Sequence, residues 1–204
     1  MEIIRVNSYT DTRFSKKVLQ QHGCFLVDDM PYEIEIISDS EAIVRGENPA
    51  VYLDLIEEFR FYAPHITVFR DQSHTIIKAF PRAKFISIPL EKIQPSQFFV
   101  DEDKIAAVST FLCEPQDIVI QVTPRGAGYI SLDGHTRLYY AVMKGWKYVR
   151  GVVDASPDYI DKFVEEANAR GIFSPKDMKL VNHTEYKEKW DDFCEQFWSS
   201  FDTK

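Results

Sequence analysis

Residues 131–137 read SLDGHTR, and their types and order could bind an anion. The apolar strand before them is expected to end at Leu132, and a helix is expected to begin near Gly134. The first turn of a helix leaves about four backbone N–H groups without partners and carries the positive end of the helix dipole. A phosphate group at this junction would therefore be stabilised by the backbone itself.

The side chains of the junction extend the same chemistry. Gly134 has no side chain, so a ligand can approach the backbone closely. His135 and Thr136 offer side-chain donors, and Arg137 offers a planar guanidinium that fits a phosphate or a carboxylate. We predict that residues 134–137 form a cradle for a phosphate-bearing small molecule.

Ordinary structural roles remain open for several of these residues. Asp133 could cap the helix, Arg137 could pair with a carboxylate on the next turn, and His135 could lie on the surface. The complete combination at a strand-to-helix junction favours the binding site.

Two carboxylates are candidates for a general base beside the cradle. Asp133 precedes the helix, and Glu91 lies in the segment IPLEKI, which we expect to converge with the junction. A base has to lie within about 3 Å, or one water molecule, of the proton that it takes. We therefore name Asp133 and Glu91 as candidate catalytic residues for phosphotransfer or nucleotide hydrolysis.

No resident metal site is predicted from the sequence. Asp101, Glu102 and Asp103 could hold Mg²⁺ beside a nucleotide, but the acidic first turn of a helix explains them as well. His65 and His74 flank a predicted hairpin without nearby carboxylates, and such a pair is typical of surface histidines.

The composition limits the classes of partner. The 204 residues include 24 Lys and Arg against 32 Asp and Glu, which gives a formal net charge of −8 and argues against DNA as the ligand. Three widely spaced cysteines indicate neither a disulfide framework nor a thiolate metal site. The N-terminus has no secretory signal pattern, and no apolar run reaches the ~20 residues of a membrane span, so we expect a cytoplasmic protein.

The pattern of apolar residues predicts an α+β protein with three parts. Residues 1–82 form an N-terminal α+β extension with strands at EIIRV, CFLV, PYEIEII and EAIVRG, and a hairpin at ITVFR and HTIIKAF. A first helix is expected from Thr12 to His22 with Gly23 as its C-cap, and a second helix is expected to open at Asn48-Pro49.

Residues 83–155 are predicted to form a mixed α/β core. Strands are expected at FISIPL, DIVIQVT, GYISL and WKYVRGVV, with a turn at Gln94 to Ser96 and a helix from Asp101 to Leu112. The turn PRGAG joins two of these strands, so it should lie at the end of the hairpin opposite the junction.

Residues 156–204 are predicted to form two helices packed on the core. Ser156-Pro157 and Thr184 are the expected N-caps, and Gly171 is expected to end the first helix. In the second helix, apolar residues recur at three- and four-residue spacing, which predicts a buried face.

Residues 85–153 resemble the ParB/sulfiredoxin-like domain. The shared pattern is a strand that ends in IPL, the turn IQPSQFF, the helix DEDKIAAVSTFL, two strands and the helix start DGHTRLYYAVMKG. In that family the last segment lies against the phosphates of a bound nucleotide, which is CTP in chromosome-partitioning members and ATP in sulfiredoxin, and a related branch transfers phosphate to free serine. The resemblance implies a ParB/sulfiredoxin-like core and a nucleotide (ATP or CTP) with Mg²⁺. It also implies nucleotide-binding roles for Gly134, His135, Thr136, Arg137 and Lys104.

The sequence departs from the family in three places. His135 stands where sulfiredoxin has its nucleophilic cysteine, so repair of a sulfinic acid is not expected. Ala107 and Phe111 replace polar residues that follow the sulfiredoxin lysine, so the adenine and ribose contacts are not implied. Residues 156–204 lack the basic helix-turn-helix of partitioning proteins, so centromere binding is not expected.

Three function classes remain for this sequence. The leading one is binding of a phosphate-bearing small molecule, most simply a nucleotide. The alternatives are a ParB-like nucleic-acid-binding or regulatory module, and an interaction module in which the cradle is vestigial. The sequence leaves the oligomeric state open.

Overall fold

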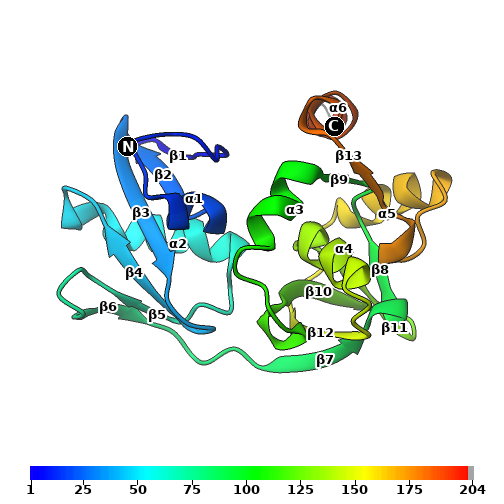
Figure 1. Cartoon of the computed structure of the whole chain (residues 1–204), viewed down its shortest axis with the longest axis horizontal. Helices are drawn as coiled ribbons and strands as arrows, with labels where there is room; N and C mark the ends of the chain where they lie inside the picture. The colour runs from blue at the N-terminus through cyan, green and yellow to red at the C-terminus, as the bar shows by residue number, and fades with distance from the viewer. Residues whose placement is uncertain (202–204) are drawn as a thin grey trace. The chain divides into compact units, whose positions relative to one another are not determined.

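The structure, a computed structural model, describes residues 1–201 and divides into two compact units (Figure 1). The first unit is Met1–Lys84, and the second begins at Phe85. Both units combine helices with β-sheet, so the predicted α+β class is confirmed. The further division at residue 155 stays a prediction.

A single six-stranded sheet organises the first unit, in the order β1-β2-β3-β4-β5-β6. Its strands are β1 (Ile3–Arg5), β2 (Cys24–Val27), β3 (Met30–Ile36), β4 (Glu41–Arg45), β5 (Val68–Arg70) and β6 (Ile76–Ala79). Only β4 and β5 pair in parallel, and they are joined through η1 (Pro49–Val51) and α2 (Tyr52–Tyr62), since parallel neighbours need a crossover. The side chain of Asn48 accepts a hydrogen bond from the Ala50 N–H at 3.0 Å, as expected of the predicted cap.

The core of the first unit lies between α2 and the sheet. Phe59 of α2 contacts Phe25 and Phe69 of the strands edge to face, with ring centroids 6.3 and 6.1 Å apart. The first predicted helix is shorter than expected: α1 spans Lys16–Gln21, and its C-cap is His22, in the left-handed conformation, and not the predicted Gly23. Gly23 is needed for a different reason, because a Cβ there would lie 2.0 Å from the carbonyl oxygen of Ile34.

A five-stranded mixed sheet organises the second unit, in the order β7-β12-β10-β11-β8. The strands are β7 (Phe85–Pro89), β8 (Ile93–Pro95), β10 (Val119–Arg125), β11 (Gly128–Ser131) and β12 (Tyr148–Val153). The short helix η2 (Leu90–Lys92) joins β7 to β8, and η3 (Pro115–Asp117) precedes β10. Residues 93–95, predicted as part of a turn, form the edge strand β8, which pairs in parallel with β11.

Two helices close the core of this sheet. They are α3 (Glu102–Val108), shorter than the predicted helix from Asp101 to Leu112, and α4 (His135–Met143). Leu138 and Ala141 of α4 are fully buried in one cluster with Ile120 and Val122 of β10. The start of α4 is therefore fixed against the sheet by ordinary apolar packing.

The C-terminal segment contains a strand, β13 (Lys179–Val181), and a short helix, η4 (Pro175–Asp177), that were not predicted. Strand β13 pairs in parallel with β9 (Phe99–Asp101) as a separate two-stranded sheet. The helices are α5 (Ile160–Ala169), α6 (His183–Tyr186), a π-helical segment η5 (Lys187–Asp191) and α7 (Asp192–Phe201), with the short helix η4 before β13. Asn182, not Thr184, caps α6, because its side chain accepts a hydrogen bond from the Glu185 N–H.

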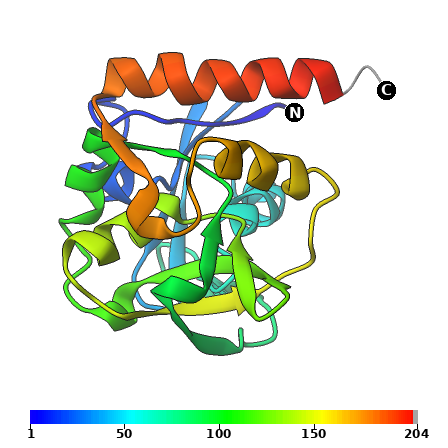
Figure 2. The same cartoon turned by 90° about the vertical axis from the view of Figure 1, so that its right-hand side faces the viewer.

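Aromatic side chains of the last helix contact the rest of the second unit. Figure 2 shows α6, η5 and α7 as one continuous run. The ring of Phe98 lies 4.9 Å from that of Trp190 and 5.0 Å from that of Phe193, and Phe163 of α5 lies 4.3 Å from Phe197. Among the helices of residues 1–201, none is long and apolar enough to cross a membrane.

Candidate functional site

Helix α4 begins at the predicted junction, and Gly134 sets its geometry. Gly134 is the N-cap with a φ of 86°, a conformation that strains other residues. A Cβ at this position would also lie 2.6 Å from Cγ2 of Ile120. Glycine is therefore required here by both the backbone angle and the space.

Arg137 folds back from the first turn of α4 over Gly134. Its Nη2 donates to Oδ2 of Asp133 at 2.8 Å, and its Nη2 and Nε lie 3.1 and 3.2 Å from where a Gly134 Cβ would be. The side chains of Arg137 and Asp133 are 21% and 44% exposed. Asp133 is thus a partner of Arg137, and the N-cap position of α4 belongs to Gly134. Thr136, half-buried, follows in the same turn.

His135 points into the protein, unlike the surface residue of the alternative interpretation. Its Nε2 accepts a hydrogen bond from the Ser96 N–H at 3.2 Å and lies 3.1 and 3.0 Å from the hydroxyl oxygens of Ser96 and Ser131. Burial lowers the pKa of His135 to about 4, so the ring is neutral at pH 7. The imidazole ring therefore links α4 to Ser131 of β11 and to Ser96, which follows β8. Only the backbone N–H of His135, and not its side chain, belongs to the N–H groups of the first turn of α4.

Lys104 lies on α3 and contacts the C-terminal segment. Its Nζ donates to the hydroxyl of Tyr186 at 3.1 Å and lies 4.3 Å from the centre of that ring. Gln97 donates to the same hydroxyl at 3.3 Å, and burial raises the pKa of Tyr186. The nucleotide contact that the resemblance implies for Lys104 stays a prediction.

A cluster beside α3 includes one residue that the sequence did not indicate. Asp101, fully buried, accepts a hydrogen bond from the Asp103 N–H and lies 2.7 Å from Nδ1 of His183. One ligand atom from each of Asp101, Asp103 and His183 lies within 4.8 Å of the others, whereas the exposed Glu102 does not belong to this set. Two carboxylates and an imidazole differ from the all-oxygen shell that Mg²⁺ prefers, and Asp101 is already satisfied as a cap. The cluster is therefore explained as the contact that joins α6 to β9.

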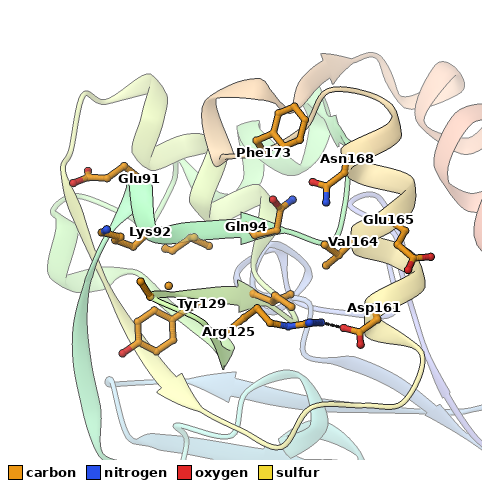
Figure 3. A pocket seen from close by; sticks show the side chains of 14 residues that line it. Glu91, Lys92, Gln94, Arg125, Tyr129, Asp161, Val164, Glu165, Asn168 and Phe173 are labelled. Atoms are coloured by element: carbon orange, nitrogen blue, oxygen red, sulfur yellow. Dashed lines mark ion pairs between the residues drawn. The ribbon is translucent and has the colours of Figure 1, made fainter.

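Glu91 lies at the opposite end of the β8–β11 pair from the junction. It belongs to the lining of a hollow of about 550 Å³, which Figure 3 shows, and neither Asp133 nor Arg137 lines it. The parallel register sets Ile93 beside Tyr129 and Pro95 beside Ser131, so Glu91 precedes one end of the pair and Asp133 follows the other. The expected convergence of Glu91 with Asp133 is wrong. The predicted position of the PRGAG turn is confirmed, since Arg125 and Gly128 line this same hollow.

Similarity to known proteins is partial. No family model matches the chain, and no curated protein matches it. Its structure is similar to protein Atu1540 from Agrobacterium tumefaciens over 44% of this chain and 49% of that one, with 17% identity and a TM-score of 0.31. It is also similar to the C-terminally truncated chromosome-partitioning protein ParB from Caulobacter crescentus complexed with CTP-gamma-S, over 43% and 54%, with 20% identity and a TM-score of 0.30.

A further similarity is to a mutant free serine kinase in complex with AMP. It covers 38% of this chain and 32% of the kinase, with 21% identity and a TM-score of 0.28. The chain therefore spans about half the length, or less, of these solved proteins. Similarities of this strength assign no ligand to this chain.

Proposed function

We propose that the protein binds a phosphate-bearing small molecule, most simply a nucleotide, at the start of α4. The observation that carries the proposal is the guanidinium of Arg137, which Asp133 holds over the N-terminal turn of this helix. Within the described residues, Arg137 donates its hydrogen bond to Asp133 through Nη2, so the other edge of the guanidinium is available to an anion.

The backbone supplies the second half of this site. The N–H groups of the first turn of α4 have no partners within the helix, and the helix dipole favours negative charge there. The first hydrogen bond inside the helix is donated by the Leu138 N–H to the Gly134 carbonyl oxygen, at 2.9 Å. Residues 135–137 therefore offer N–H groups in the turn beside the arginine.

Binding is better supported than a reaction. Asp133 already accepts a hydrogen bond from Arg137 through Oδ2, so this oxygen is engaged within the protein. Glu91 lies at the other end of the β8–β11 pair, where it cannot reach a phosphate at α4. We therefore propose a nucleotide-binding protein and assign no phosphotransfer or hydrolysis step.

A thermal-shift titration with ATP and with CTP, each with Mg²⁺, tests the proposal. A ligand at about 100 times its dissociation constant should add roughly 2.7 kcal/mol to the free energy of unfolding. Affinity should change little between 50 and 200 mM salt, because one pocket releases few counterions. A DNA duplex that binds with a steep salt dependence would support the nucleic-acid alternative, and no shift with any nucleotide would support the interaction module.

A further inference from the structure

The hollow beside α5 has the size of a small-molecule site and is separate from the start of α4. Its volume of about 550 Å³ lies within the range of roughly 300–1,000 Å³ that is common for ligand pockets. Strands β8 and β11 form its floor, the β10–β11 turn and α5 form two walls, and Phe173 lies at its rim (Figure 3).

The charges around this hollow leave its centre uncharged. Arg125 of the turn forms an ion pair with Asp161 of α5, so neither charge is left over for a ligand. Figure 3 shows the carboxylates of Glu91 and Glu165 directed away from Gln94, which lies at the centre. Lys92 also lines the hollow, but Figure 3 shows it at the end near Glu91, away from Asn168, so the polar groups at the centre are uncharged.

Two carboxamides supply the polar groups of the centre instead. The Nε2 of Gln94 donates to the carbonyl oxygens of Pro95 and Ile172, at 2.9 and 2.8 Å. These bonds fix the amide, so its Oε1 is presented as an acceptor. The carboxamide of Asn168 has no hydrogen-bond partner within residues 1–201, and in Figure 3 it projects from α5 beside Gln94. It offers a donor and an acceptor side by side.

Phe173 supplies an aromatic face next to these amides. Its side chain is 63% exposed although it is large and apolar, and Val164 of α5 adds a second apolar side chain to the lining. A ring that packs on Phe173 can direct its edge toward Asn168 and Gln94 (Figure 3). Carboxamides pair with the donor and acceptor edges of nucleobases, and aromatic side chains stack on their faces.

We propose that this hollow binds a flat, uncharged heterocycle of the nucleobase type, as a free base or a nucleoside. Phe173 stacks on the ring, Asn168 pairs with a donor-acceptor edge, and Oε1 of Gln94 accepts from a ring N–H or an amino group. The inference is independent of the proposed function, because a nucleoside carries no phosphate for the α4 site.

Ligand-observed NMR with the full chain and the nucleosides adenosine, cytidine, guanosine and uridine tests this inference. At least one should bind saturably, and Phe173→Ala and Asn168→Ala should each weaken that binding roughly tenfold. Both side chains are exposed, so the variants should remain folded. Phe111→Ala, which removes an exposed aromatic ring that does not line the hollow, is the matched control and should bind as the parent chain does.

Other outcomes overturn the inference. These are the absence of saturable binding by any nucleoside, and binding that neither Phe173→Ala nor Asn168→Ala weakens. Binding of L-phenylalanine in place of nucleosides would assign the hollow to charged ligands and would also contradict the inference.

Arg137→Ala should leave nucleoside binding unchanged, so loss of binding in this variant would place the nucleoside at α4 instead. A single-stranded oligonucleotide that binds while free nucleosides do not would make the partner a nucleic acid.

Discussion

The guanidinium of Arg137 is bonded to the carboxylate of Asp133, four residues earlier, across the first turn of α4. Both side chains are partly exposed, and such pairs typically add only about 0–1 kcal/mol to the free energy of unfolding. The pair therefore mainly orients the guanidinium of Arg137. In the proposed site, it holds this group beside the backbone N–H groups that would bind the anion. Losing the arginine should affect ligand binding more than folding.

Arg137→Ala should weaken nucleotide binding about ten- to a hundredfold. A charge-assisted hydrogen bond contributes about 1.5–3 kcal/mol, and each 1.4 kcal/mol changes affinity tenfold. Arg137→Lys keeps the charge but loses the planar fork, so it should also bind less tightly than the parent chain. Isothermal titration calorimetry gives the affinity, and melting temperature without ligand gives the effect on the fold.

Arg13→Ala is a matched control for this experiment. Arg13 also pairs with an aspartate, Asp11, at 2.7 Å, but it belongs to the first unit and does not line the hollow beside α5. Its loss should leave nucleotide affinity unchanged. Arg137 would be a structural residue only if Arg137→Ala lowered the melting temperature and left the nucleotide affinity intact.

Gly134→Ala should destabilise the second unit by roughly 2–5 kcal/mol. The left-handed backbone conformation costs about 1–2 kcal/mol for alanine, and forcing a methyl group against a packed side chain adds about 1–3 kcal/mol. That side chain is Ile120, whose Cγ2 would lie 2.6 Å from the new Cβ. Urea denaturation measures the loss.

Gly126→Ala separates the two contributions. Gly126 also has a positive φ, 56°, but a Cβ there would have nothing within 4 Å. Only the backbone strain remains, so we expect a loss of about 1 kcal/mol. Equal losses in the two variants would show that Ile120 does not resist the methyl group at position 134.

The regular elements could be predicted because their apolar residues repeat at helical or strand spacing. Helix α4 and strands β10, β11 and β12 all lie where that spacing places them. The three-residue strands β8, β9 and β13 were missed, because they lie next to prolines and turn residues, whereas the equally short β1 and β5 lie in the longer apolar runs EIIRV and ITVFR. Strand β13 forms only because it meets β9, about eighty residues earlier in the chain.

The site was predictable only where its residues adjoin in sequence. The junction 133–137 could be identified locally, whereas the direction of the His135 ring depends on Ser96 and Ser131. The contact between Asp101 and His183 joins residues 82 positions apart, and His183 has no local signature that would link it to Asp101. Glu91 was paired with Asp133 wrongly, because the parallel register of β8 with β11 could not be known.

Acid should destabilise the protein through His135. Its pKa in the folded protein is about 4, below the ordinary value of 6.5, because burial disfavours the charged ring. Between these two pH values the unfolded chain binds a proton that the folded protein excludes. Stability should therefore fall as the pH drops from about 6.5 to about 4, by on the order of 3 kcal/mol.

His135→Gln isolates this contribution from that of the carboxylates. The glutamine oxygen can accept from the Ser96 N–H where Nε2 does now, but it takes up no proton in this range. Urea denaturation at pH 7 and at pH 4.5 should show a smaller loss for this variant than for the parent chain. If both proteins lost the same stability, His135 would have to be protonated in the folded state as readily as in the unfolded chain.

Phe163→Ala should loosen the C-terminal helix and destabilise the second unit by about 3–5 kcal/mol, the usual cost of removing a buried aromatic ring. Phe163 is buried on α5 and contacts the rings of Trp190, Phe193 and Phe197. Its loss removes the shared partner of these rings, so trypsin should cleave after Lys187 or Lys189 faster than in the parent chain.

Phe173→Ala is the control, because removing its exposed ring should change the free energy of unfolding by no more than about 0.5 kcal/mol in the absence of ligand. Unchanged cleavage together with unchanged stability in Phe163→Ala would mean that these ring contacts do not hold the helix in place.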